Sequence, residues 1–137
     1  MVLVSLPPMP SIFSKIVTGE IPAERIREDD DFLAFLDIRP IRPGHTLVIP
    51  KQEIDPFFAL PDDLLAGLMV FAKPVANAIR DETGAERVGC AVLGIEVPHA
   101  HLHLVPVDGA HDIDFRRAAD ADPADLKAMG ERLRARL

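Results

Sequence analysis

The sequence predicts one α+β domain with an antiparallel sheet of about five strands, one long helix and short terminal helices. Its 137 residues are the length of one ordinary domain. Hydrophobic residues make up 48% of the chain, which is enough to bury a core. Strand and helix patterns follow in the order strands, helix, strands, helix, so we expect the helices to cover one face of the sheet.

The first half of the chain predicts a short helix and three strands. Ser11 can cap a helix over residues 12–18, which Gly19 ends. Residues 37–44 hold two prolines and a glycine, so we expect a loop there. Residues 1–10 hold three prolines and are expected to form a flexible arm. Apolar and β-rich runs predict strands over residues 25–28, 32–36 and 45–49.

The second half predicts a long helix, two strands and a last helix. Apolar residues at helical spacing follow Pro61 and continue to Gly84. Pro74 lies inside this run and should kink the helix or cost it one hydrogen bond. The expected strands cover residues 87–93 and 99–105, the expected loops residues 94–98 and 109–121, and the last helix residues 123–137.

Composition excludes several classes of partner and site. The 15 basic and 22 acidic residues leave a net charge of −7, which disfavours duplex DNA or an anionic membrane as the main partner. Cys90 is the single cysteine, so an intrachain disulfide and a cysteine-rich zinc site are excluded. Apolar runs stay well below the roughly 18 residues of a membrane helix. The N-terminus lacks the basic region of a signal peptide, so we expect a cytoplasmic protein.

Three of the five histidines lie in one run, at His99, His101 and His103. In a strand these side chains share one face, because successive side chains alternate. Three polar rings cannot form ordinary core, so they should line a cleft. The face could be an incidental polar surface. It could also hold a metal with Glu96 or His111, or supply a nucleophile for phosphoryl transfer.

The run His99-Ala-His101-Leu-His103-Leu-Val105 fits the pattern His-φ-His-φ-His-φ-φ, in which φ is apolar. Upstream segments add to it: Ile12–Val17, Gly19–Ala23, Glu28-Asp-Asp, Phe32–Pro40 and Gly44-His45-Thr-Leu-Val-Ile-Pro50-Lys51. On these motifs the chain resembles the histidine triad (HIT) family, and its HINT-like nucleotide-binding members in particular. The resemblance implies a HIT domain over residues 11–108, with residues 109–137 as a C-terminal loop and helix outside it.

The resemblance implies a nucleotide phosphohydrolase or nucleotidyl transferase that needs no cofactor. It would act on the α-phosphate of a nucleotide conjugate, a phosphoramidate or a dinucleoside polyphosphate, with a purine as the expected base. His101 matches the family's nucleophile, which forms a covalent nucleotidyl-histidine. His99 matches the histidine that supports its orientation, and His103 the one that faces the phosphate oxygens. Family members commonly join two sheets across a homodimer, so we expect a homodimer.

The resemblance also implies a nucleoside pocket. Asp37 matches the carboxylate that takes both ribose hydroxyls. Gly94 and Glu96 lie in the segment that approaches the phosphate and leaving group. The positions that hold the base in apolar contacts are matched by Phe13, Ile16, Phe35, Ile38 and Leu47.

This sequence departs from the family pattern in four respects. Some relatives hold zinc with two cysteines, a histidine and the first triad histidine, and the cysteine and histidine positions here are Ser11, Ser14 and Glu53. The segment Val88-Gly89-Cys90 lacks the family's asparagine, and the chain lacks the tryptophan that some relatives lend across a dimer. Glu96 stands near a position where many relatives have serine.

These departures keep other functions open. A carboxylate at Glu96 would repel phosphate unless it were protonated or paired, and a protonated Glu96 could act as a general acid. The alternatives to an efficient hydrolase are a nucleotide-binding or regulatory module with little turnover, and a metal-dependent hydrolase that uses the histidine face. We expect no structural zinc.

Overall fold

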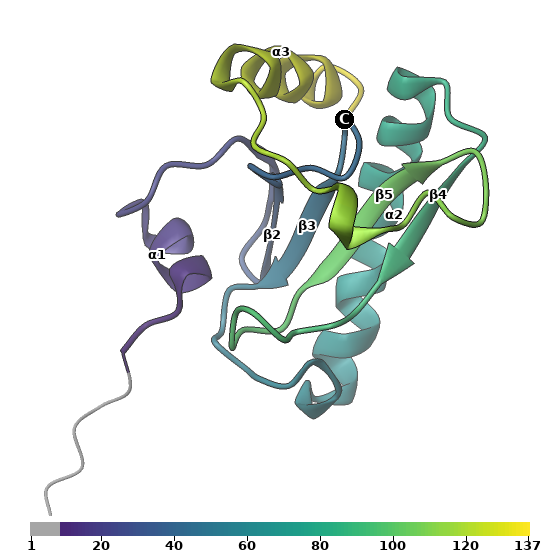
Figure 1. Cartoon of the computed structure of the whole chain (residues 1–137). Helices are drawn as coiled ribbons and strands as arrows, with labels where there is room; N and C mark the ends of the chain where they lie inside the picture. Colours follow the sequence, from purple (N-terminus) through teal and green to yellow (C-terminus); the bar gives the residue numbers. More distant parts are fainter. Residues whose placement is uncertain (1–8) are drawn as a thin grey trace, which may run out of the picture.

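The computed structural model describes residues 9–137 (Figure 1). Most of the predicted arm, residues 1–10, lies outside the described residues. Within residues 9–137, no helix is both long and apolar enough to cross a membrane.

A five-stranded antiparallel sheet forms the centre of the molecule, and the predicted α+β class is confirmed. The strands lie in the order β1-β2-β3-β5-β4. Their bounds are β1 Arg25–Glu28, β2 Phe32–Leu36, β3 Thr46–Pro50, β4 Arg87–Ala91 and β5 Leu102–Val107. On β5, His103 is paired with Leu47 of β3 and Ala91 of β4. This register places the last triad histidine inside the sheet, between two neighbouring strands.

The two faces of the sheet have separate apolar cores. Phe32, Ala34 and Leu36 of β2 face α2 (Asp62–Thr83) and α3 (Pro123–Arg134). The alternate residues Leu33 and Phe35 pack with α1 (Ile12–Thr18). In Figure 1, α2 runs behind the strands and α1 lies apart from it. The expectation of helices on one face therefore holds for α2 and α3, whereas α1 covers the opposite face.

Helix ends follow their local signals. Ser11 caps α1 by accepting a hydrogen bond from the Ser14 N–H, and Gly19 ends the helix with φ at 85°, a conformation that glycine adopts at little cost. Asp122 caps α3 in the same way, by accepting from Ala124. The helix α2 is continuous through Pro74, whose missing N–H costs it one hydrogen bond.

Several bounds differ from the prediction. The strand β5 begins at Leu102 rather than at His99, because the N–H groups of His99 and Ala100 donate to the carbonyls of Val97 and Ile54 instead of to a neighbouring strand. The strand β3 is shifted by one residue and β4 ends at Ala91. Two short 3₁₀ helices that the sequence did not predict are η1 (Phe57–Ala59) and η2 (Phe115–Arg117).

Candidate active site

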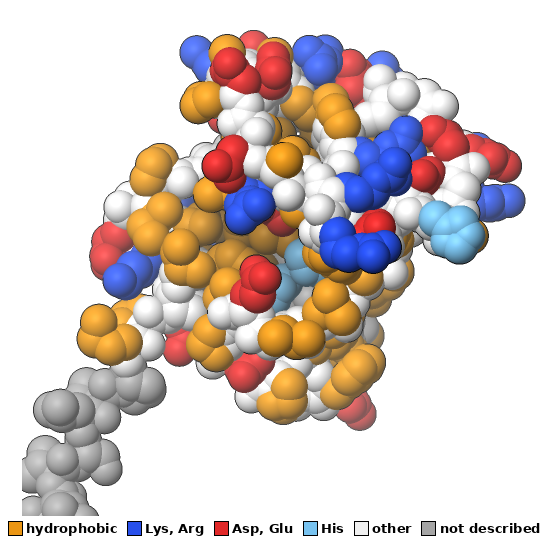
Figure 2. All heavy atoms as spheres, in the orientation of Figure 1, with side chains coloured by type: hydrophobic (Ala, Val, Ile, Leu, Met, Phe, Trp, Pro, Cys, Tyr) orange, Lys and Arg blue, Asp and Glu red, His pale blue; other side chains and the backbone are white. Residues whose placement is uncertain are grey.

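The three triad histidines form a row of buried rings. The ring centroids of His101 and His103 are 5.0 Å apart, and Phe13 of α1 stands edge-on to His101 at 5.0 Å and to His99 at 5.8 Å. In Figure 2, histidine side chains lie at the bottom of a hollow bordered by hydrophobic side chains, with Lys and Arg side chains beside it. The predicted common face is therefore present, although His99 and His101 precede the strand.

His101 is held in one tautomer by the backbone. Its Nδ1 lies 2.6 Å from the carbonyl oxygen of His99. A carbonyl oxygen only accepts, so Nδ1 carries the proton and donates it. The lone pair of Nε2 is then free, which is the condition for an imidazole nucleophile. The contribution of His99 to this orientation comes through its backbone oxygen.

His103 is held by His45, a residue to which the sequence motif assigned no role. The Ile41 N–H donates to Nδ1 of His45 at 3.0 Å, so a neutral His45 carries its proton on Nε2. That nitrogen lies 2.9 Å from Nδ1 of His103 and donates to it. His103 therefore carries its own proton on Nε2, which makes that nitrogen a hydrogen-bond donor.

Burial keeps this pair neutral. It lowers the pKa of His45, against the opposing influence of Asp37. Burial, followed by the proximity of His45 and His101, lowers the pKa of His103 to about 3. Both rings are thus neutral near pH 7, and the tautomers follow from the hydrogen bonds alone.

His99 is fully buried and has a partner on each ring nitrogen. Its Nε2 donates to the Pro50 carbonyl at 2.8 Å, and its Nδ1 accepts from the Ser11 hydroxyl at 2.8 Å. The Ser14 hydroxyl donates to Glu53 Oε1 at 2.8 Å, and the Ser11 N–H donates to the same oxygen. These two bonds lower the pKa of Glu53, the Ser11 N–H being the larger cause.

Ser11, Ser14, Glu53 and His99 are the four positions that the resemblance assigns to zinc in some relatives. The fold brings them together, but the donor set does not fit the metal. Zinc sites of this kind use thiolates and free imidazole nitrogens. Here two hydroxyls replace the thiolates, and both nitrogens of His99 are already in hydrogen bonds.

Four of the five apolar residues predicted to contact a base lie in one buried cluster with Leu33 and Ile49. They are Phe13, Ile16, Phe35 and Leu47. Ile38 does not join them: it lies on the loop after β2, its side chain is 66% exposed, and its carbonyl accepts from the Ala121 N–H. The sheet and α1 thus form one apolar cluster, whereas Ile38 is exposed outside it.

Asp37 has one oxygen in a turn and one near the histidines. Its Oδ1 accepts from the Arg39 N–H at 2.9 Å, as an Asx turn requires. Its Oδ2 lies 3.6 Å from Nε2 of His45. The ligand atoms of Asp37, His45 and His103 all lie within 4.8 Å of one another. Both nitrogens of His45 are already used in hydrogen bonds, so the arrangement is a hydrogen-bonded relay.

The loop over residues 94–98 leads directly into the triad, and Ile95, Glu96 and Pro98 are exposed in it. Glu96 is exposed, and within residues 9–137 it has no hydrogen bond or ion pair. Gly94 takes a φ of 71° in the same loop, in the region that favours glycine. His111 is exposed on a later loop. Neither Glu96 nor His111 belongs to the His and acid cluster found among the described residues, so neither completes a metal site on the triad.

Comparison with known proteins agrees with this geometry. Residues 18–110 match the HIT domain family. The chain is 36% identical to the Protein hit of Bacillus subtilis, over 92% of this chain and 93% of that one. It is 38% identical to an adenosine 5'-monophosphoramidase of Saccharomyces cerevisiae, over 69% of this chain and 61% of that one.

Among solved structures, a Zn-bound histidine triad family protein from Mycobacterium smegmatis matches with a TM-score of 0.78 and 37% identity, over 91% of both chains. The HIT domain match covers most of the chain, and the Bacillus relative is similar along nearly its whole length. This protein therefore belongs to the histidine triad family of nucleotide-binding hydrolases and transferases.

Proposed function

We propose that this protein is a nucleotide phosphohydrolase or nucleotidyl transferase that acts on the α-phosphate of a nucleotide conjugate. The observation that carries the proposal is the pair of neighbouring imidazole rings of His101 and His103, whose Nε2 atoms are in opposite protonation states. His101 offers an unprotonated Nε2 and His103 offers a protonated one, with ring centroids 5.0 Å apart. A nucleophile beside a hydrogen-bond donor is what attack on an anionic phosphate needs.

The reaction then has two displacements. The Nε2 lone pair of His101 attacks the α-phosphorus, and the bond from phosphorus to the leaving group breaks with its electron pair. The Nε2–H of His103 donates to a non-bridging phosphate oxygen as charge builds there. Water, or an acceptor hydroxyl in a transfer reaction, next attacks the phosphorus and breaks the P–N bond, which returns His101 to its starting form. The proton that this water or hydroxyl loses balances the proton that the leaving group takes up.

The nucleoside would lie against the wall made by Phe13, Ile16, Phe35 and Leu47, with Ile38 at the rim. Asp37 would accept hydrogen bonds from the ribose hydroxyls through Oδ2, which is free of the turn. A phosphoramidate or a dinucleoside polyphosphate of a purine is the substrate class we propose. The similarity to an adenosine 5'-monophosphoramidase supports the first of these.

A homodimer is part of the proposal. The strand β4 is at one edge of the sheet and has no neighbour beyond it among residues 9–137. An unpaired edge can add a strand from a second copy. Sedimentation of the purified protein at micromolar concentration should give twice the chain mass of 15.0 kDa, and a monomer would contradict this part.

The test of the function is His101→Asn, with His111→Asn as the matched control at an exposed histidine outside the site. On a panel of adenosine phosphoramidates and adenylated phosphates, His101→Asn should lower turnover by at least about 10³-fold, because covalent catalysis is lost. His111→Asn should match the wild type. Rapid acid-free quenching should trap a nucleotidyl adduct in the wild type. Turnover near the wild-type level in His101→Asn would refute the mechanism.

Two alternatives give different results in the same assays. A binding or regulatory module would bind the nucleotides but show no turnover and no adduct. A metal-dependent hydrolase would show turnover that a chelator removes and a metal restores.

A further inference from the structure

The segment that follows the HIT domain match, residues 111–137, contacts the triad through η2. Phe115 of η2 stands edge-on to the ring of His103 with centroids 4.9 Å apart, and to His45 at 6.5 Å. At the other end of the row, Phe13 stands edge-on to His101. Two phenyl rings from distant parts of the chain therefore bracket the His101–His103 pair, and one of them covers the ring that His45 orients.

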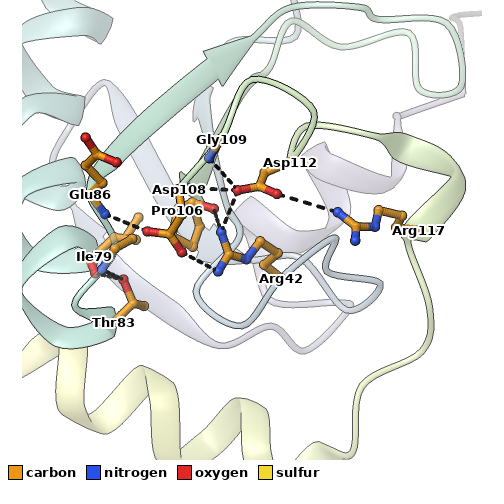
Figure 3. Close-up of polar contacts among 10 residues, drawn as sticks. Arg42, Ile79, Thr83, Glu86, Pro106, Asp108, Gly109, Asp112 and Arg117 are labelled. Carbon is orange, nitrogen blue, oxygen red and sulfur yellow. Dashed lines mark hydrogen bonds and ion pairs between the residues drawn. The ribbon is translucent and has the colours of Figure 1, made fainter.

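An ion-pair network holds this segment in place (Figure 3). Arg42 belongs to the loop that leads to His45, and its guanidinium contacts Asp108 at 2.9 Å and Asp112 at 3.1 Å. The Asp112 carboxylate also accepts from the N–H groups of Asp108 and Gly109, at 2.7 and 2.8 Å. Its second oxygen lies 3.6 Å from Arg117, at the end of η2.

The network links the two segments that flank the relay. Arg42 precedes His45 by three residues, and Arg117 follows Phe115 by two. Asp114 adds a local cap by accepting from the Arg116 N–H, which fixes the start of η2. The position of the Phe115 ring is thus tied to the loop that carries His45.

We propose that Phe115 is a positioning residue for His103. It fixes the plane of the ring and keeps water away from the hydrogen bond between His45 and His103. Water at that bond would compete for Nδ1 of His103 and would favour its protonation, which ends the acceptor role. This inference rests on the proposed function in one respect, namely that His103 donates to a phosphate oxygen of the substrate.

The titratable groups that face His103 are His45 on the β3 side, His101 before β5, and Asp37 beyond His45. None of them lies on the C-terminal segment. Removing the phenyl ring therefore changes the hydration of His103 without removing a charge. A change in the protonation of His103 in such a variant can therefore be assigned to loss of the Phe115 ring.

The experiment compares Phe115→Ala, Phe115→Leu and Phe58→Ala. Phe58 is the matched control, because it is a phenylalanine that is 79% exposed on η1. The first readout is the titration of His103 by NMR of ring-labelled histidine. In Phe115→Ala its midpoint should rise by about 1 pH unit or more toward the ordinary value, because hydration favours the charged form. In Phe115→Leu the His103 midpoint should lie close to the wild-type value, because an apolar side chain still covers the ring. In Phe58→Ala the midpoint should equal the wild-type value.

The second readout is steady-state kinetics on an adenosine phosphoramidate. Phe115→Ala should lower kcat by roughly 10- to 100-fold with little change in KM, as expected for a displaced catalytic group. Asp112→Asn should shift the His103 midpoint and kcat in the same directions as Phe115→Ala does. The double variant with Phe115→Ala and Asp112→Asn should show less than the sum of the two single effects, because both substitutions act on the His103 ring.

Some outcomes would overturn the proposal. One is an unchanged His103 midpoint in a folded Phe115→Ala protein. Another is a rise in KM alone, which would make Phe115 a substrate contact. The NMR titration needs no substrate, so it decides the proposal even if the wild-type protein turns over no nucleotide. A failure of the proposed function is recognised separately, because the His101→Asn variant would then turn over nucleotides as fast as the wild type does.

Discussion

Replacing Ser11 by alanine removes a hydroxyl that has two structural roles. The hydroxyl oxygen accepts the Ser14 N–H at 3.0 Å, which caps α1. Its proton is donated to Nδ1 of His99 at 2.8 Å, inside the protein. The variant therefore loses a helix cap and leaves the buried Nδ1 of His99 with only a 3.5 Å contact to the Ser14 hydroxyl, whose proton is donated to Glu53.

The cost can be worked from these two contacts. Loss of a serine N-cap costs about 1 kcal/mol. An unsatisfied buried acceptor costs about 1–3 kcal/mol. The free energy of unfolding should therefore fall by about 2–4 kcal/mol. The Ser11 N–H to Glu53 contact is a backbone bond and stays in the variant.

The assay is urea unfolding followed by circular dichroism at pH 7.5, where the buried His45, His99 and His103 are neutral in the folded state. Thr18→Ala is the matched control. Thr18 lies at the other end of the same helix, and its hydroxyl is exposed and donates to the Lys15 carbonyl. That change should stay within about 0.5 kcal/mol of the wild type. The reasoning fails if Ser11→Ala also stays within that range.

Four further predictions concern the site. Asp37 should discriminate against a 2'-deoxy nucleotide by about 1–3 kcal/mol of binding free energy, and equal affinities in calorimetry would leave Asp37 only its turn role. If Glu96 is a general acid, Glu96→Gln should slow turnover most for poor leaving groups, whereas equal rates across leaving groups would make Glu96 a solvated side chain. Purified protein should contain no stoichiometric zinc, and a chelator should leave its urea midpoint unchanged, so one tightly bound zinc per chain in elemental analysis would contradict the donor-set argument. Burial lowers the folded-state pKa of His45, His99 and His103, so below about pH 6.5 the unfolded chain binds more protons. The free energy of unfolding should then be at its full value above that pH and fall as the pH drops toward 3, and a flat urea midpoint from pH 7.5 to 4.5 would be inconsistent with neutral buried histidines.

Much of the fold could be predicted because its signals are local. Ser11 and Gly19 bound α1 where the sequence placed them, since a cap involves groups only three or four residues apart. Strands β1 and β2 also have the predicted bounds, because short β-rich or apolar runs between turn residues favour strands. The spacing of the three histidines likewise predicted that they would share one side of the sheet.

The partners of these residues could not be read from local patterns. His45 and His103 are 58 residues apart and meet only because β3 pairs with β5. Ser11 and His99 are 88 residues apart and meet only because α1 packs on the face opposite α2. Phe115 reaches His103 through a loop held by Arg42 and Asp112.

The sequence by itself therefore determined the three α-helices, the order of the five strands along the chain, the family motif and the residue types at the site. Only the tertiary structure decided the tautomer of each histidine, the outward position of Ile38 and the start of β5 after His101. The physical reason is that each of these depends on which distant carbonyl, N–H or ring lies within about 3–5 Å of the group. Hydrogen bonds and ring contacts over such distances form only once the chain has folded. They leave a free lone pair on Nε2 of His101 and a hydrogen-bond donor on Nε2 of His103.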